Sequence, residues 1–377
     1  MELLEFLGIN IDELFSSGGD DSNPIMWLVW IVPIIIFMFY GQRIQLQITS
    51  SEISKSIDKL KKFKEETKTE LVDYIKTTIK PATDPSPNLD RFLEHFTIMP
   101  VDMDPNGIVP KIRHIMRSRE DYVRQQVKAL SSDINSIEAS KIENILEAAT
   151  TLHLLYKIVR HLFLTAKKQN NFPLILPLQM MMPFIMEEAE ALKTAVSAFK
   201  QGQPIGDGIG PMVVGKLMLG TAKKTAAFET VWSESEYDGR KLYLMKAEGP
   251  AATVGRPGDA LERIISESKP DVMIMIDAAL KMEGEDTGSV AQGFGAAIGG
   301  IGTDRFQIEE IATKHKIPIH AIVVKQSIKE AITLMKKEIA DSVDKVESQV
   351  YETIKENTKS GQSVLVIGVG NTLGVSQ

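Results

Sequence analysis

The sequence of 377 residues contains no cysteine, and only 6% of its residues are aromatic. Without cysteine the chain has no disulfide bond, no thiolate zinc site, no iron–sulfur cluster and no catalytic thiol. An excess of positive charge is also lacking, because 43 Lys and Arg residues stand against 50 Asp and Glu residues, for a net charge of −7. This balance gives no general electrostatic attraction to nucleic acid, so we expect no nucleic-acid partner.

The chain is longer than one compact core usually requires, and 43% of it is hydrophobic, so we expect several folded domains. Changes in composition place their boundaries. We predict an extracytoplasmic acidic leader (1–24), a transmembrane helix (25–41), an amphipathic helix (42–80), a linker (81–105), a helical domain (106–202) and an α/β domain (203–377).

One uncharged apolar run, from Ile25 to Tyr40, predicts a membrane anchor. At about 1.5 Å per residue it spans roughly 24 Å, slightly less than a ~30 Å hydrocarbon core. Acidic residues precede the run and basic residues follow it, which places the N-terminus outside and the remainder in the cytoplasm. We therefore expect a single-pass protein of the cell membrane with lipid as a partner. The alternative is a buried helix of a folded core.

The region after this run has the pattern of amphipathic helices. Between Ser50 and Lys80 apolar residues recur every three or four positions, which predicts a helix able to pair with a second copy as a coiled coil. A homo-oligomer through residues 50–80 is the corresponding expectation. Further helices are predicted at 106–130 and 131–168. Residues 172–186 are apolar but contain three prolines, so a connector is expected there.

After Gly202 short apolar runs alternate with helical patterns, which is typical of an α/β fold. The runs at 271–280, 317–324 and 363–370 read as buried strands. Strand–helix–strand alternation predicts a three-layer domain, with a mostly parallel sheet and helices on both faces.

Polar and glycine residues follow two of these strands, where ligands bind in parallel sheets. Asp277 ends one strand, and Gly368, Gly370 and Asn371 end another; we take the latter three as cofactor-binding candidates. The loop after Asp277 carries the acidic residues Glu283, Glu285 and Asp286. These are either an ordinary solvated loop or ligands of a hard divalent cation such as Mg²⁺.

Two segments of the α/β domain resemble a known fold. GDGIGPMVVGKL (206–217) and DVMIMIDAALKMEGEDTG (271–288) resemble two signatures of hydrogenase maturation endopeptidases and of the spore germination protease. In those families the first signature follows a strand ending Gly-x-Gly-Asn-x-Leu, which here is found at 363–374. The resemblance, over about residues 203–377, is therefore to a circularly permuted maturation-peptidase type of fold. The whole chain also resembles an archaeal membrane-associated family of unknown function.

The resemblance implies a role for one acid in each signature, Asp207 and Asp277. Two desolvated carboxylates at neighbouring strand ends share either a cation or a proton, and a shared proton is what water activation by an acid–base pair requires. The metal-binding families also use a histidine, which the corresponding loop here lacks. Glu283, Glu285 and Asp286 are the substitute ligands in that case.

Three hypotheses follow. The first is a membrane-anchored hydrolase facing the cytoplasm, most simply a peptidase, which uses Asp207 and Asp277 on a protein or peptide with or without a divalent metal. The second is a non-catalytic protein, tethered to the membrane, that binds a ligand or a metal in the same pocket. The third is a scaffold organised by the membrane-proximal helices.

Overall fold

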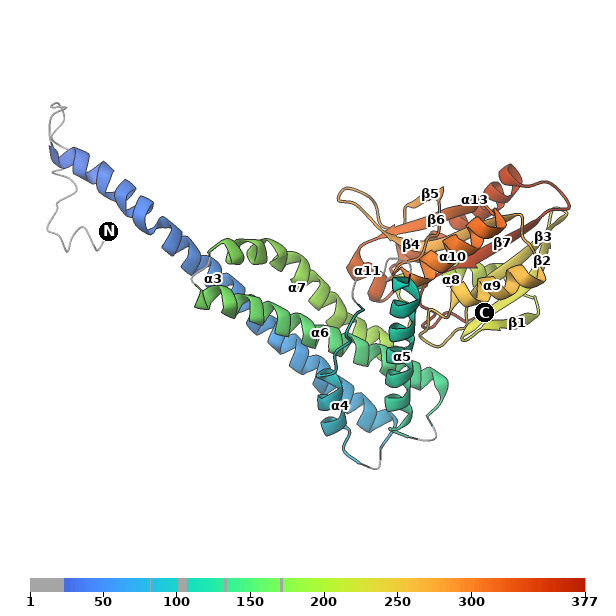
Figure 1. Cartoon of the computed structure of the whole chain (residues 1–377), viewed down its shortest axis with the longest axis horizontal. Coiled ribbons are helices and arrows are strands. Elements are labelled where there is room, and N and C mark those ends of the chain that lie inside the picture. The colour runs from blue at the N-terminus through green and yellow to red at the C-terminus, as the bar shows by residue number, and fades with distance from the viewer. Residues whose placement is uncertain are drawn as a thin grey trace. The chain divides into compact units, whose positions relative to one another are not determined.

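The computed structural model describes residues 24–81, 83–100, 107–131, 134–169, 172–300 and 302–376. The chain divides into two compact units, Met1–Asp58 with Val159–Pro183 and Lys59–Ile158 with Phe184–Gln377. The predicted acidic leader lies outside the described residues except for Pro24. Figure 1 shows helices in the N-terminal half of the chain and a sheet in the C-terminal half.

The described N-terminal half is helical. Its elements are α3 (Pro24–Thr78), α4 (Ser86–Leu93), α5 (Ile108–Lys128), α6 (Ser136–Lys168) and α7 (Phe172–Gln201). Helix α4 falls inside the predicted linker, and α7 continues through the segment expected to be a connector, with Pro177 and Pro183 inside it.

In the second unit the helices share a hydrophobic core. Leu71 and Ile75 of α3 pack in one cluster with Ile142 and Ile145 of α6 and Phe199 of α7. Leu71 and Ile75 are 0% exposed within the single chain, because α6 and α7 cover the apolar stripe of α3. Pairing with a second copy through residues 50–80 stays a prediction, and these two side chains are not free to take part in it.

The prediction of a transmembrane helix at residues 25–41 is wrong. Pro24 begins α3, which continues without a break to Thr78. Within the part of the chain that the structure describes, no helix has an apolar stretch long enough to cross a membrane. The physical reason is length, because a run that ends at Tyr40 is shorter, at about 1.5 Å per residue, than a ~30 Å hydrocarbon core. The predicted membrane location and orientation are therefore wrong as well.

The described C-terminal half contains one seven-stranded sheet in the order β1-β2-β3-β7-β4-β6-β5. The strands are β1 (Lys223–Ala227), β2 (Thr230–Tyr237), β3 (Arg240–Ala247), β4 (Val272–Leu280), β5 (Val290–Phe294), β6 (Ile319–Gln326) and β7 (Ser363–Gly368). The pairs β3–β7, β7–β4 and β4–β6 are parallel, and the pairs β1–β2, β2–β3 and β5–β6 are antiparallel.

The sheet is thus mixed, and the expectation of a mostly parallel sheet is wrong, although the α/β content agrees in part. Short turns explain the difference. Asp238 and Gly239 alone connect β2 to β3, and so short a turn can join only antiparallel strands.

Helices cover both faces of the sheet. On one face α8 (Ile209–Leu217) and α13 (Val343–Asn357) pack against Ile274 and Ile276 of β4. On the other face α9 (Pro257–Glu267) and α10 (Thr303–His315) pack against Met273 and Met275 of the same strand. Alternate residues of a strand point to opposite faces, so β4 contributes to both cores. The shorter elements are η1 (Gly206–Gly208), α11 (Ile328–Ile332) and α12 (Lys337–Asp341).

The last strand of the chain occupies the middle of the sheet. β7 pairs with β3 on one side and with β4 on the other, and its carboxyl end meets the start of α8. A Cβ atom on Gly368 would lie 2.4 Å from the carbonyl oxygen of Gly210, so the two backbones touch. The fold therefore brings the end of the chain onto the segment around residue 207.

Candidate functional site

Asp207 lies in η1, immediately before α8. The backbone of this segment is in contact with the ends of two strands. A Cβ atom on Gly210 would lie 2.3 Å from Val369 O and 2.4 Å from Ile276 O. Only glycine permits such an approach, so the glycines of the GDGIG sequence fix Asp207 at the carboxyl ends of β7 and β4.

Asp277 ends the buried part of β4 and is 6% exposed. The Oδ1 atom of Asp277 accepts a hydrogen bond from the backbone N–H of Ala278 at 2.7 Å. The backbone N–H of Gly299, in the glycine-rich turn before α10, also donates to this carboxyl. Asp277 lies on the same face of β4 as Met273 and Met275, which are part of a hydrophobic core. Its carboxyl group is therefore next to that core, at the end of the strand.

Asp207 and Asp277 line one cavity of about 360 Å³. Met116 and Glu120 of α5 form part of its wall, and Thr303 and Asp304 at the start of α10 form another part. The two predicted acids therefore share a cavity, to which both the helical half and the α/β half of the chain contribute.

Burial and mutual repulsion act on the two carboxyls. Burial raises the pKa of Asp277 well above its ordinary value, and the charge of Asp207 raises it further. Burial also raises the pKa of Asp207, while a hydrogen bond from the backbone of Asn371 opposes that shift. Each carboxyl therefore takes up a proton at a higher pH than an isolated aspartate does, and Asp277 does so under the influence of both burial and Asp207. The arrangement can therefore present a proton donor and a proton acceptor in one place.

The turn after β7 supports Asp207. The backbone N–H of Asn371 donates a 2.7 Å hydrogen bond to Asp207 Oδ2. Gly370 has a φ of 133°, and a Cβ atom there would lie 1.9 Å from the carbonyl oxygen of Asp207. Of the three predicted cofactor-binding residues, Gly370 lines the cavity, Asn371 supports Asp207, and Gly368 is covered by Gly210.

The acidic loop after β4 is not part of the cavity wall. Glu285 forms an ion pair with Lys325 at 3.3 Å, and Glu283 and Asp286 are exposed. Across the described ranges, no group of three or more His, Asp or Glu residues is placed to hold a metal ion. Of the five predicted metal ligands, the structure therefore brings together only Asp207 and Asp277.

Two further acids of the wall, Glu120 and Asp304, were not predicted from the sequence. Burial is the largest influence on each, and it raises the pKa of both. Asp304 comes just after the glycine-rich stretch 293–302. Because glycine-rich backbone can approach a ligand closely, this position in the sequence is a signal by which Asp304 could be found. Glu120 lies within α5, far from the site in sequence, and no local pattern marks it.

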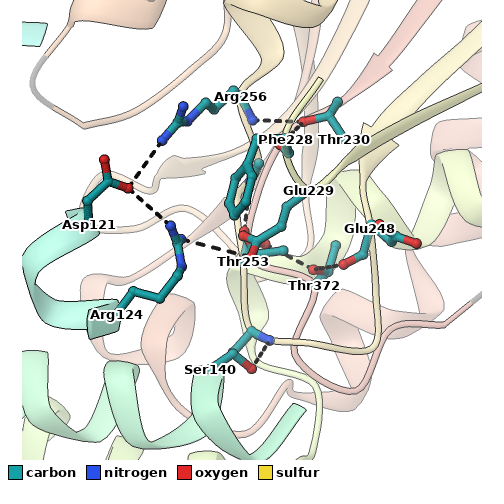
Figure 2. A network of polar contacts seen from close by, with 12 residues as sticks. Asp121, Arg124, Ser140, Phe228, Glu229, Thr230, Glu248, Thr253, Arg256 and Thr372 are labelled. Carbon is teal, nitrogen blue, oxygen red and sulfur yellow. Dashed lines mark hydrogen bonds and ion pairs between the residues drawn. The ribbon is translucent and has the colours of Figure 1, made fainter. Parts of the chain in front are cut away.

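A polar network holds α5 against the α/β half (Figure 2). The guanidinium groups of Arg124 and Arg256 lie 4.4 Å and 5.0 Å from the ring centroid of Phe228. Asp121 contacts Arg124 at 3.3 Å and Arg256 at 3.9 Å. Cation–π and ionic contacts thus fix the helix that forms the cavity wall.

Two family models match the chain. Residues 27–202 match one described as "Protein of unknown function (DUF1512) N-terminal domain", and residues 205–376 match one described as "Domain of unknown function (DUF1512) C-terminal". The first match covers the helical half and the second covers the sheet with Asp207 and Asp277. No curated protein sequence matches the chain.

Proposed function

Since these two matches cover most of its length, the chain belongs to the DUF1512 family, and we propose that it is a hydrolase in which Asp207 and Asp277 activate water. One observation carries the proposal: both carboxyls line the same cavity and repel each other there. Asp277 is buried and Asp207 is half-buried. Desolvated carboxyls that repel each other are costly to the fold and are typical of catalytic sites.

The two acids would take different roles. Asp277 keeps the shared proton because burial and the charge of Asp207 both raise its pKa. Asp207 is the better base because the N–H of Asn371 stabilises its ionised form. Each acid is held by backbone donors, so the pair is oriented before a substrate binds.

The reaction with an amide needs no further group. Asp207 takes a proton from water while the water oxygen bonds to the carbonyl carbon, and Asp277 gives its proton to the carbonyl oxygen. The tetrahedral intermediate then breaks its C–N bond. The leaving nitrogen takes the proton from Asp207, and one hydroxyl proton returns to Asp277. The products are a carboxylic acid and an amine, and both carboxyls regain their starting states.

A peptide is the substrate class that we favour. The two signatures around Asp207 and Asp277 resemble those of maturation endopeptidases and of the germination protease. The cavity of about 360 Å³ is within the range of ligand-binding sites. Apolar side chains such as Met116 and Ile298 line it beside the acids, which suits a partly apolar peptide segment.

The test is cleavage of a peptide library prepared from a digested proteome, with new termini identified by mass spectrometry. We expect cleavage by the full-length protein and a loss of about 100-fold or more in Asp207→Asn and in Asp277→Asn. Asp341→Asn, at an exposed aspartate at the end of α12, is the matched control and should retain full activity. Cleavage that persists in both site variants would refute the proposal.

A cation-binding protein without turnover is the second candidate. It is favoured by the same pair of carboxylates, because Mg²⁺ is commonly bound through one or two carboxylates with water completing its coordination. Mg²⁺ binding that requires both Asp207 and Asp277, together with an absence of cleavage of the whole library, would decide for this candidate.

A further inference from the structure

Helix α6 reaches the paired aspartates through one side chain. Asn144 Oδ1 accepts a hydrogen bond from Asn371 Nδ2 at 3.3 Å. The backbone N–H of the same Asn371 donates to Asp207 Oδ2 at 2.7 Å. One residue of the C-terminal turn therefore connects the N-terminal family domain, which contains Asn144, to an acid of the C-terminal family domain.

Asn144 is itself held in place. Its Nδ2 donates to the carbonyl oxygen of Ser140 at 2.8 Å and to that of Ala252 at 2.9 Å. An asparagine amide has two donor hydrogens and one carbonyl oxygen. Both hydrogens and the oxygen of Asn144 are thus in use, which fixes the orientation of its side chain toward Asn371.

The turn that carries Asn371 is fixed by its neighbours too. Asn371 Oδ1 accepts a hydrogen bond from the backbone N–H of Leu373 at 2.9 Å. The hydroxyl of the fully buried Thr372 lies 2.7 Å from Ala251 O and 3.0 Å from Thr253 O. Figure 2 shows Thr372 and Thr253 beside the loop that Ser140 also contacts. Hydrogen bonds on both sides of Asn371 therefore hold the turn that presents its N–H to Asp207.

We propose that Asn144 is a positioning residue of the paired-aspartate site: by holding the side chain of Asn371, it aims the Asn371 N–H at Asp207. The catalytic meaning of this site rests on the proposed function, whereas the hydrogen bonds among Asn144, Asn371 and Asp207 do not depend on it. The N-terminal family domain then completes a site whose two acids belong to the C-terminal domain. Met116 and Glu120 on the cavity wall are further contributions from the same domain.

The proposal has a measurable electrostatic consequence. The hydrogen bond from Asn371 lowers the pKa of Asp207 against the upward shift that burial causes. If the N–H turns away, the Asp207 carboxylate loses a donor and takes up its proton at a higher pH. A residue that only stabilises the fold would change the free energy of unfolding and leave this titration where it is.

The experiment is a carboxyl ¹³C NMR titration of the full-length protein, with Asp207 assigned by the loss of its signal in Asp207→Asn. Asn144→Ala and Asn371→Ala both remove the bond between the two side chains, and both retain the Asn371 N–H. Asn144→Ala also removes the bonds to Ser140 O and Ala252 O, and Asn371→Ala also removes the bond from the Leu373 N–H. We expect each to raise the titration midpoint of Asp207 by roughly half a pH unit or more. The shift in the double variant should be smaller than the sum of the two single shifts, because the bond between the two side chains is lost only once.

Ser140→Ala is the matched control. Ser140 Oγ accepts a hydrogen bond from the backbone N–H of Ala252 at 3.0 Å, so it joins the same helix to the same loop without touching Asn371. The Asp207 midpoint should stay at its wild-type value in this variant. A shift as large as that of Asn144→Ala would mean that α6 merely anchors the loop, and the proposal would be overturned.

The remaining outcomes are also decisive. Unshifted midpoints, or shifts that add in the double variant, overturn the role of Asn144. If Asn144→Ala does not fold, Asn371→Ala decides alone. If the Asp207 midpoint shifts in the variants but the wild type cleaves no peptide, the hydrolase proposal fails and the positioning role of Asn144 stands. Where cleavage occurs, Asn144→Ala should lower kcat about 10-fold and leave KM within about 2-fold.

Discussion

Asp207 and Asp277 repel each other across a cavity that both of them line, and this repulsion adds to the effect of burial on the pKa of Asp277. The fold holds the two acids together despite the cost, through the close contact of Gly210 with the ends of β4 and β7. An arrangement that is unfavourable for folding and rigidly built is what a proton-sharing site requires.

Asp277→Asn is expected to make stability less dependent on pH. The folded-state pKa of Asp277 is raised, so its contribution to stability is complete below the unfolded value, near pH 4, and is lost as the pH rises through the folded value. The loss is about 1.4 kcal/mol per pH unit over that window. Urea unfolding between about pH 4 and pH 8 should show that the free energy of unfolding of Asp277→Asn increases relative to that of the wild type as the pH rises.

Asp341→Asn serves as the control here too, because its carboxylate is exposed. Its stability should follow the wild-type pH dependence. An Asp277→Asn protein whose stability falls in parallel with the wild type would contradict the assignment of a raised pKa to Asp277.

Mg²⁺ and the shared proton are expected to compete for the same pair. Below the raised pKa values the pair holds a proton and offers a divalent cation little charge; above them both carboxylates are ionised and their repulsion favours a cation. Millimolar MgCl₂ should therefore raise the Tm at about pH 9 and have no effect at about pH 5. Asp277→Asn should lose the effect, and an equal stabilisation of that variant would place the cation elsewhere.

The parts of the site that the sequence predicted are those that local chemistry determines. A continuous apolar run ending in Asp277 reads as a buried strand with an acid at its end, and the resemblance of GDGIGPMVVGKL to a known signature singles out Asp207. The structure places both acids in one cavity, with the strand at the end of the chain beside them. Glu120 and Asn144 could not be found this way, because their positions depend on how separate helices pack.

The error at residues 172–186, where a connector was expected, has a physical cause in tertiary packing. Proline costs a helix interior about 3 kcal/mol, which argues against helix in an apolar segment with three of them. Yet α7 runs through Pro177 and Pro183, and residues along it such as Ile175 and Ala189 are buried in the fold. Tertiary packing outweighs the local cost. The membrane prediction failed for a different reason, the length of the run, because sixteen apolar residues are fewer than the roughly 20 that a transmembrane helix needs.

Gly210→Ala tests the contact that places Asp207. The added Cβ would lie 2.3 Å from Val369 O and 2.4 Å from Ile276 O, both backbone atoms that cannot move without displacing β7 or β4. We expect a loss of stability of about 2–4 kcal/mol by urea unfolding, together with loss of peptide cleavage. Gly293→Ala, in β5, is the matched control, because a Cβ there has no atom within 4 Å and should be tolerated. Equal stability of the two variants would contradict the packing.

Lys246→Met is expected to stabilise the protein at neutral pH. Lys246 of β3 is 1% exposed, and its Nζ donates to Ala247 O at 2.9 Å. Burial, reinforced by the charge of Lys223, lowers its pKa to about 8. A lowered folded-state pKa contributes stability above the unfolded value, near pH 10.5, and that stability is lost as the pH falls through about 8. The loss amounts to about 3 kcal/mol at pH 7 and exceeds the roughly 1 kcal/mol of the hydrogen bond.

Urea unfolding at about pH 7 and about pH 10 should therefore show a gain for Lys246→Met at the lower pH that shrinks or reverses at the higher one. Lys241→Met, on the same strand with its side chain 53% exposed, is the control and should change stability by less than about 1 kcal/mol at either pH. A Lys246→Met protein less stable than the wild type at neutral pH would mean that the buried ammonium is better compensated than its contacts indicate. The ammonium would then be a structural ion of the sheet, because only a well-compensated charge stabilises a fold from within its core.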